Sequence, residues 1–197
     1  MKADFSKLDA NNIVAFLGDI FARCGAEEYL GEPVTMAEHM LQGAALAEAA
    51  GAPDEIVAAA LLHDIGHFTH EFPDNAAEQG IDSVHEEAGA AVLAPFFPLV
   101  VTDCVRHHVA AKRYLCGTDP KYFDRLSPAS VHSLNLQGGP MGKEEATEFR
   151  RRNPNLRAIL QVRIWDEAGK EAGKPTPDFA HYAPVLQRVV DRHMTAG

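Results

Sequence analysis

The chain has little sulfur and no excess of positive charge. Its three cysteines, Cys24, Cys104 and Cys116, form no closely spaced metal motif, and their odd number favours a reducing compartment over a disulfide framework. The 18 Lys and Arg residues are outnumbered by 28 Asp and Glu residues, which gives a formal net charge of -10. Nucleic acid and anionic membrane surfaces are therefore poor partners, because the average surface repels them. An anionic small molecule is still allowed as a substrate where local cations gather.

Long apolar runs are also missing. No stretch of about 18 apolar residues is present to span a bilayer, and residues 1–12 lack the apolar core of a signal peptide. We therefore expect a soluble, cytoplasmic protein with no membrane partner. A chain of 197 residues with 46% hydrophobic content can bury one substantial core. The length thus predicts a single domain, residues 1–197.

Period-2 alternation is nearly absent, whereas helix start and stop signals recur along the chain, so we predict an all-α bundle. Thr35 with Glu38 forms a capping box for a helix that carries His39, and Ser83 with Glu86 forms a second box. The predicted helices cover about residues 13–24, 36–51, 54–67, 83–95, 98–115, 127–138, 154–166 and 178–193, and the predicted loops cover 68–82, 116–126 and 167–177. The first loop is long and aromatic, which suggests a lid.

The most informative motif is His63-Asp64-Ile65-Gly66-His67. His63 can bind one metal ion through its imidazole, and the two oxygens of Asp64 can bridge to a second ion. On a continuous helix His67 returns to the face of His63 one turn later. Ile56 and Ala60 place that face on the buried side, where a polar group needs a partner.

Further candidate ligands occur singly on separate predicted helices, each on or beside an apolar stripe. Any one of them is more often a satisfied core polar group than a ligand. Five helices with the same pattern favour a shared centre of four imidazoles and two carboxylates, which suits iron or manganese without excluding zinc. The full set of predicted metal ligands is His39, His63, Asp64, His85, His108 and Asp166.

This set resembles the HD-domain superfamily of metal-dependent hydrolases and, within it, the oxygenase branch that contains myo-inositol oxygenase. A narrower resemblance is to the mixed-valent diiron oxygenases that cleave 2-amino-1-hydroxyethylphosphonate or its N-trimethyl relative, and it covers about residues 13–190. Ordinary HD hydrolases need none of the segments that carry it. These segments are Tyr29-Leu-Gly-Glu32 before Glu38-His39, His108-Val-Ala-Ala-Lys-Arg-Tyr-Leu115, Leu126-Ser-Pro-Ala-Ser130 with Gln137-Gly-Gly-Pro-Met141, and Arg163-Ile-Trp-Asp166.

The resemblance implies an HD-domain helical bundle with a mixed-valent Fe(II)/Fe(III) pair in its core. By that resemblance His39, His63 and Asp166 hold one iron, His85 and His108 hold the other, and Asp64 bridges them. Tyr29 matches a phenol that occupies the substrate's coordination position in the resting enzyme, and Glu32 matches a carboxylate that turns toward the substrate amine. The implied reaction uses O2 to cleave the carbon–phosphorus bond, which gives phosphate with glycine or glycine betaine.

Predicted substrate contacts lie beside the metal ligands. Lys112 follows His108 by four residues, so its ammonium can meet an oxyanion on the metal, and His67 has the same relation to His63. Arg163 precedes Asp166 by three residues and offers a bidentate fork for a phosphonate. The resemblance places the Ser130 hydroxyl on the phosphonate too. The alternative for Lys112 and Arg163 is a solvated salt bridge, and the run 150–152 of three arginines is expected to be a solvated face.

Two other functions would use the same ligands. The first is a phosphohydrolase in which two divalent metals activate water against a phosphate ester, although Tyr29 would block a water site to no benefit. The second is a catalytically silent HD module, which retention of the whole ligand set argues against. Among phosphonates, Phe68, Phe72 and Met36 favour the trimethylated substrate, because a quaternary ammonium prefers aromatic faces and a carboxylate, here Tyr29 with Glu32.

Overall fold

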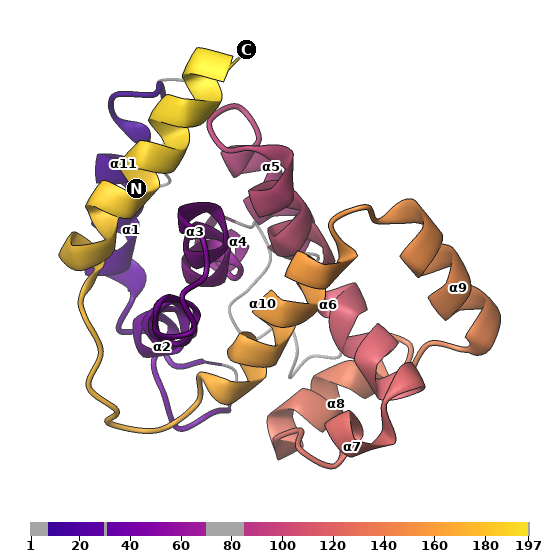
Figure 1. The fold of residues 1–197 in the computed structure, drawn as a ribbon. Helices are drawn as coiled ribbons and strands as arrows, with labels where there is room; N and C mark the ends of the chain where they lie inside the picture. The colour runs from indigo at the N-terminus through magenta and orange to yellow at the C-terminus, as the bar shows by residue number, and fades with distance from the viewer. Residues whose placement is uncertain (1–7, 30, 70–84, 197) are drawn as a thin grey trace.

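The computed structural model describes residues 8–29, 31–69 and 85–196, and the regular elements of these residues are all helices (Figure 1). The all-helical prediction is confirmed. No described helix combines the length and apolar composition needed to cross a membrane. The helices are α1 (Ile13–Cys24), α2 (Met36–Ala49), α3 (Asp54–Leu62), α4 (Gly66–Thr69), α5 (His85–Leu93), α6 (Leu99–Thr118), α7 (Pro120–Phe123), α8 (Pro128–Leu136), α9 (Lys143–Arg152), α10 (Leu156–Ala168) and α11 (Phe179–Ala196).

Helix α3 lies in the middle of the bundle and packs against α2, α6, α10 and α11 (Figure 1). Residues 57–62 are all buried, as expected of a helix that is apolar on every side. Small side chains let α2 approach closely, since a Cβ on Gly43 would come 3.3 Å from the Ala60 carbonyl oxygen. The central helix thereby brings its carboxyl end, where His63 follows, against residues of the surrounding helices.

Helix α6 belongs to two apolar clusters. Its first half, including Val101 and Cys104, is part of the main core. Its second half, including Tyr114 and Leu115, joins a smaller cluster beneath α7, α8 and α9. Lys112 lies between these halves and is buried. One long helix therefore connects the main core to the outer layer on the right of Figure 1.

The predicted helix caps form where the structure describes them. Thr35 and Glu38 make the full capping box of α2, with Glu38 N–H donating to Thr35 Oγ1 at 3.2 Å and Thr35 N–H donating to Glu38 Oε2 at 2.8 Å. Ser127 caps α8 by accepting from the Ser130 N–H at 3.0 Å. The Ser83 box and almost all of the predicted lid, with Phe72, lie outside the described residues.

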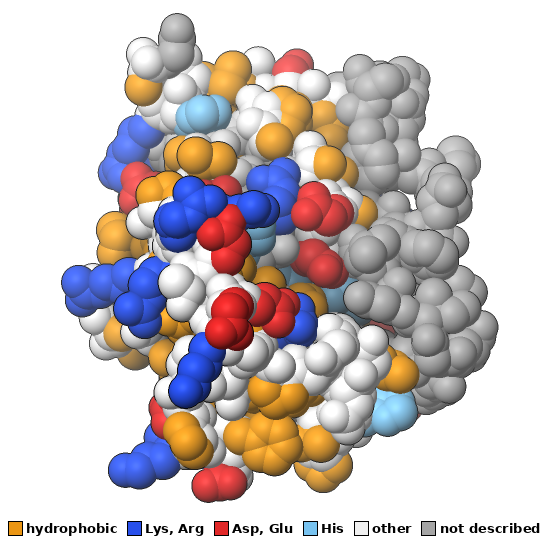
Figure 2. All heavy atoms as spheres, turned by 90° about the vertical axis from the view of Figure 1, so that its right-hand side faces the viewer, with side chains coloured by type: hydrophobic (Ala, Val, Ile, Leu, Met, Phe, Trp, Pro, Cys, Tyr) orange, Lys and Arg blue, Asp and Glu red, His pale blue; other side chains and the backbone are white. Residues whose placement is uncertain are grey.

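One loop prediction needs correction, and one helix was missed. The predicted loop 116–126 is largely helical, because α6 continues to Thr118 on the second apolar cluster and Pro120 begins α7. Helix α9 was not predicted, since it is almost entirely charged and polar and only Ala146 of its residues is buried. Its carboxyl end does form the expected solvated face, where Arg151 and Arg152 pair with Glu148. Figure 2 shows acidic and basic side chains interspersed over this side of the molecule.

Candidate dimetal centre

The helix that precedes the His63-Asp64 pair ends earlier than the sequence predicts. Helix α3 stops at Leu62, the next three residues form a turn, and α4 begins at Gly66. Ile65 N–H donates to the Leu62 carbonyl and His67 N–H to the Asp64 carbonyl, so the chain tightens there. The prediction of one continuous helix over 54–67 is therefore wrong, although the turn still directs His63 and Asp64 inward.

The break in the helix is tied to close packing of α5. A Cβ on Gly66 would lie 1.8 Å from the carbonyl oxygen of His85, so only glycine allows the two backbones to meet. This contact fixes the start of α5 beside the turn. His85, the first residue of α5, is thereby placed next to Asp64.

One group of ligand atoms surrounds Asp64 Oδ2. His39 Nε2 and His63 Nε2 lie 3.0 Å apart, and they are 3.5 Å and 3.3 Å from Asp64 Oδ2. Asp166 Oδ1 lies 3.4 Å from His39 Nε2 and 3.8 Å from His63 Nε2. We call these four atoms the first ligand set. Helices α2 and α10 and the turn after α3 each contribute to it.

A second group surrounds Asp64 Oδ1. His85 Nε2 and His108 Nε2 lie 3.1 Å apart, and each is 3.1 Å from Asp64 Oδ1. His67 Nε2 is farther away, 3.8 Å from the same oxygen, and its ring stacks on His85 with centroids 3.8 Å apart. We call the atoms of His85, His108 and Asp64 the second ligand set. Each oxygen of Asp64 thus serves a different set.

The imidazole rings are oriented by backbone carbonyls. His39 Nδ1 contacts the Gly169 oxygen at 2.9 Å, His63 Nδ1 contacts the Ala60 oxygen at 2.9 Å, and His108 Nδ1 contacts the Val105 oxygen at 2.7 Å. A proton on each Nδ1 leaves Nε2 free to act as a ligand, which is how metal-binding histidines are commonly held.

The arrangement fits two bound cations. Asp64 Oδ1, Asp64 Oδ2 and Asp166 Oδ1 are buried and have no hydrogen bond within the described residues, so they need another partner. Ligand atoms roughly 2.1 Å from one ion lie roughly 3 Å apart at right angles, close to the spacings within each set. Nitrogen and oxygen donors without thiolate suit iron or manganese.

The electrostatics around the first ligand set also favour positive charge. Burial by itself would raise the pKa of Asp166, but Arg163 and the nearby imidazoles hold that pKa well below its usual range. Burial lowers the pKa of His39, yet Asp166 and Asp64 outweigh it and raise the pKa to about 9. A cation at His39 Nε2, whether a proton or a metal, is therefore stabilised.

Tyr29 and Glu32 lie in the turn before α2, next to the first ligand set. The Tyr29 ring stacks on the His39 ring with centroids 4.0 Å apart, and burial together with Asp64 and Asp166 raises the pKa of its phenol. The Glu32 carboxylate is buried and accepts a hydrogen bond from Ser127 Oγ. Tyr29 therefore contacts a residue of the first ligand set, whereas the contacts of Glu32 are with Ser127 and Lys170.

The predicted anion-binding residues also lie here but contact protein groups. Arg163 donates to Asp166 Oδ2, to Glu167 Oε2 and, at 2.7 Å, to the Tyr122 hydroxyl. Ser130 Oγ donates to Glu167 Oε2 at 2.8 Å. The Arg163 fork thus holds a metal ligand as well as a neighbouring carboxylate.

Lys112 forms the remaining part of this anion-binding group. Its ammonium donates to Ser133 Oγ at 2.7 Å. Burial and the neighbouring Arg163 lower its pKa to about 7. The Lys112 ammonium can therefore lose its proton near neutral pH.

Sequence reasoning missed Glu167 and Lys170. It placed both in a loop, whereas α10 continues through Ala168 and Lys170 folds back over the site. Lys170 Nζ contacts Ser130 Oγ at 2.6 Å, Glu32 Oε1 at 2.9 Å and Glu167 Oε2 at 3.1 Å. The spacings from Arg163 to Glu167 and from Glu167 to Lys170, four and three residues, were the available signal.

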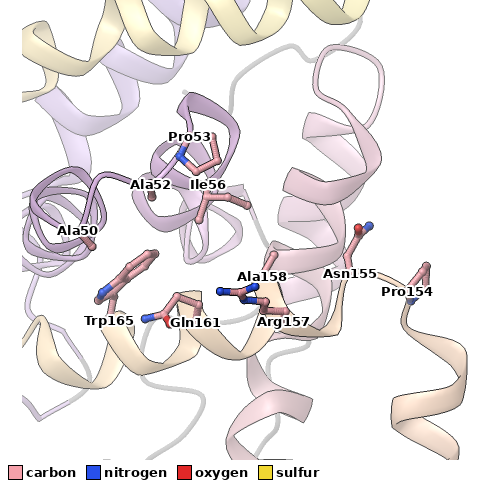
Figure 3. A pocket seen from close by; sticks show the side chains of 10 residues that line it. All are labelled: Ala50, Ala52, Pro53, Ile56, Pro154, Asn155, Arg157, Ala158, Gln161 and Trp165. Atoms are coloured by element: carbon pink, nitrogen blue, oxygen red, sulfur yellow. The ribbon is translucent and has the colours of Figure 1, made fainter.

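A pocket of about 500 Å³ lies elsewhere, between α10 and the loop that joins α2 to α3 (Figure 3). Trp165, Gln161 and Ile56 are among its lining residues, and none of the predicted ligands lines it. Trp165 precedes Asp166 on α10 but points into this pocket. The predicted chemistry therefore does not involve it.

Comparison with known proteins places these features in a family. The model of the HD domain matches residues 36–160, which include five of the six predicted ligands. The chain belongs to the HD-domain family. This match and the buried His/Asp cluster confirm the predicted HD-domain bundle with a metal site.

Two relatives carry informative names. The chain is 64% identical over 195 residues to a [1-hydroxy-2-(trimethylamino)ethyl]phosphonate dioxygenase (glycine-betaine-forming) from Leisingera caerulea, and the match covers 99% of both chains. It is 43% identical over 166 residues to a hydroxymethylphosphonate dioxygenase from Gimesia maris, with 84% of this chain and 82% of the relative covered. The predicted relationship to phosphonate dioxygenases is confirmed.

Proposed function

We propose that this HD-domain protein is an iron-dependent dioxygenase that cleaves the carbon–phosphorus bond of 1-hydroxy-2-(trimethylammonio)ethylphosphonate. The observation that carries the proposal is the 64% identity, along essentially the whole of both chains, to the glycine-betaine-forming relative. The trimethylated substrate is favoured over the free amine for the same reason. A buried set of six nitrogen- and oxygen-donor residues supports the choice of two irons, a mixed-valent Fe(II)/Fe(III) pair.

The overall chemistry balances with O2 as the oxidant. The hydroxyphosphonate dianion and O2 give the carboxylate of glycine betaine, hydrogen phosphate and one proton. One oxygen atom from O2 enters each product, and C1 is oxidised while its bond to phosphorus breaks. The bound irons would supply the electron transfers with O2 that closed-shell organic side chains do not provide.

The chain's own residues would bind and orient the substrate beside the metals. Lys112, Ser130 and Arg163 would meet the phosphonate oxygens, with Arg163 exchanging part of its contact to Glu167 for the substrate. The substrate would displace the Tyr29 side chain from its position beside His39. Glu32 would face the quaternary ammonium, which attracts a carboxylate through charge alone because it has no N–H donor.

Lys112 and His67 would also handle protons. A Lys112 pKa of about 7 lets this residue hold or release a proton at the phosphonate near neutral pH. Burial and the neighbouring His85 keep the pKa of His67 well below its usual range, so His67 would act as a neutral imidazole. Both roles follow from side chains that are largely withdrawn from solvent.

The proposal is tested by the stoichiometry of one reaction. Iron-loaded protein should consume O2 and release phosphate and glycine betaine in equal amounts, and with ¹⁸O2 each product should gain one labelled oxygen. His63→Ala should abolish the reaction, while His132→Ala, which alters an exposed histidine, should not. Phosphate release without O2, or full activity with zinc alone, would contradict the oxygenase, and hydrolysis of a phosphate ester by the same protein would support the phosphohydrolase.

A further inference from the structure

The side chains of Glu32 and Tyr29, which would receive the substrate cation, already contact a cation of the protein. Lys170 Nζ lies 2.9 Å from Glu32 Oε1 and 5.9 Å from the centre of the Tyr29 ring. A carboxylate and an aromatic face are the partners that a quaternary ammonium prefers. Lys170 is also largely buried, with 9% of its side chain exposed, so it is not a loosely placed surface lysine.

We propose that Lys170 is a specificity-determining residue that occupies the cation subsite in the resting protein and competes with the substrate's quaternary ammonium for Glu32 and Tyr29. This inference rests on the function proposed above. Displacement of Lys170 would lower the affinity of the protein for cationic substrates only. A hydroxyphosphonate without an amine would bind with Lys170 left in place.

The side chain of Lys170 can leave while its backbone stays. On one side, the Gly169 carbonyl accepts from His39 Nδ1 at 2.9 Å. On the other, Glu171 and Gln42 exchange two hydrogen bonds, from Gln42 Nε2 to the Glu171 oxygen at 2.8 Å and from Glu171 N to Gln42 Oε1 at 3.1 Å. A backbone held at both neighbours leaves the flexible four-carbon side chain as the part that moves.

Glu32 does not depend on Lys170 for its position. The Ser127 hydroxyl donates to Glu32 Oε1, and Ser127 is itself fixed as the cap of α8. Glu167, which also contacts Lys170, keeps its contacts to Arg163 and Ser130 when the lysine leaves. Removing the ammonium should therefore free Glu32 and Tyr29 for another cation without displacing the carboxylate.

The test compares Lys170→Met with wild type in two binding measurements. Anaerobic calorimetry on iron-loaded protein uses the trimethylammonio substrate and hydroxymethylphosphonate, which lacks an amine. NMR titration with tetramethylammonium probes the cation subsite alone and needs neither iron nor turnover. We expect Lys170→Met to bind the trimethylammonio substrate and tetramethylammonium about fivefold or more tightly than wild type, a typical size for contacts of a cation with an aromatic ring. Its affinity for hydroxymethylphosphonate should be unchanged.

Two control variants define the effect. Lys170→Arg keeps the competing charge and should resemble wild type. Lys174→Met removes the exposed lysine of a nearby pair, in which Lys174 Nζ lies 2.8 Å from Glu171 Oε2, and should change neither affinity. If the loss of any nearby positive charge raised the affinity for the cationic ligands, Lys170→Met and Lys174→Met would both bind them more tightly. That result would contradict the proposal.

The direction of the change decides the outcome. Weaker or unchanged binding of tetramethylammonium by Lys170→Met would overturn the proposal, because Lys170 would then support the cation subsite or lie outside it. If wild type turned over no hydroxyphosphonate but Lys170→Met still bound tetramethylammonium more tightly, the proposed function would fail and the assignment of Lys170 would stand.

Discussion

The two sides of Asp64 are built differently. On the Oδ2 side, the protein supplies four ligand atoms, and His39, His63 and Asp166 are at most 1% exposed. On the Oδ1 side it supplies three, from His85, His108 and Asp64, while His67 stays 3.8 Å away. A metal on the second side would therefore keep more positions for other ligands.

The supports behind the two sides also differ. The first ligand set is joined to the proposed substrate-contacting residues, because Arg163 holds both Asp166 and Glu167. The second set depends on backbone contact between Gly66 and the start of α5. Substitutions at Arg163 or Glu167 should consequently affect the first ligand set. Substitutions that alter the packing of Gly66 against α5 should affect the second ligand set.

Removal of the shared ligand should have the largest effect. We expect Asp64→Asn to lose most of both metals and at least about a thousandfold in activity, because the charged carboxylate of Asp64 belongs to both sets. Metal content per chain, measured by atomic emission, checks this. Asp103→Asn is the matched control, since Asp103 is also buried but contacts Asn155. Retention of two irons by Asp64→Asn would show that no bridge exists.

Variants of one side should separate the sets. His39→Ala and His85→Ala should each retain about one metal per chain, because each leaves the other set intact, including the shared carboxylate of Asp64. The same metal analysis distinguishes them. Loss of both metals in either variant would mean that the two sets bind cooperatively and that their independence, as inferred from the geometry, is wrong.

Packing around the second set is tested at a glycine. Gly66→Ala should destabilise the protein by about 1–3 kcal/mol or more, since the added methyl group would meet the His85 carbonyl. Thermal unfolding and metal content check the result, and the second metal should be the one weakened. Gly142→Ala is the control, because a Cβ there has no neighbour within 4 Å. Equal stability of the two variants would contradict the close approach.

The smallest effect is a pH dependence from Lys112. With a pKa of about 7, its charged form declines as pH rises from 6 to 8, so affinity for the phosphonate should fall by up to about tenfold per pH unit above 7. In Lys112→Met, the affinity should change with pH only through the titration of the phosphonate itself, without the additional fall due to Lys112. An identical pH profile in both proteins would remove Lys112 from the anion site.

The lowered pKa of Lys112 affects the stability of the fold in the opposite direction, because stability should rise with pH where phosphonate affinity falls. The unfolded chain's lysine has the ordinary pKa of 10.5, so it binds more protons than the folded protein between pH 7 and 10.5. The free energy of unfolding should therefore rise with pH across this window in wild type, relative to Lys112→Met. Denaturant titrations at pH 7 and pH 9 measure the difference.

Several of the predicted metal ligands had a local signal. His39 follows a capping box, and His108 and Asp166 each lie four residues after a buried apolar residue, Cys104 and Val162, so their faces could be assigned from spacing. The pattern failed at the break after Leu62, where a tertiary contact between Gly66 and His85 ends the helix. Propensity cannot reveal a close approach between segments about 20 residues apart.

The partners of the proposed substrate-contacting residues were only partly predictable. Glu167 follows Arg163 by four residues on α10, so spacing could have shown this pair, whereas Tyr122 contacts Arg163 from α7, 41 residues earlier in the chain. Lys170 follows Glu167 by three residues, but its position beyond the end of α10 depends on the contacts of Gly169 and Glu171 with α2. These tertiary contacts leave no short-range pattern.

We propose that Asp64 joins two irons within one coupled pair. Electron paramagnetic resonance of partly oxidised, iron-loaded protein, combined with iron analysis, is the sharpest test of this bridge. We expect about two irons per chain and a mixed-valent signal that disappears in Asp64→Asn. One iron per chain with only an isolated ferric signal, in wild type as in the variant, would show that Asp64 does not join two irons.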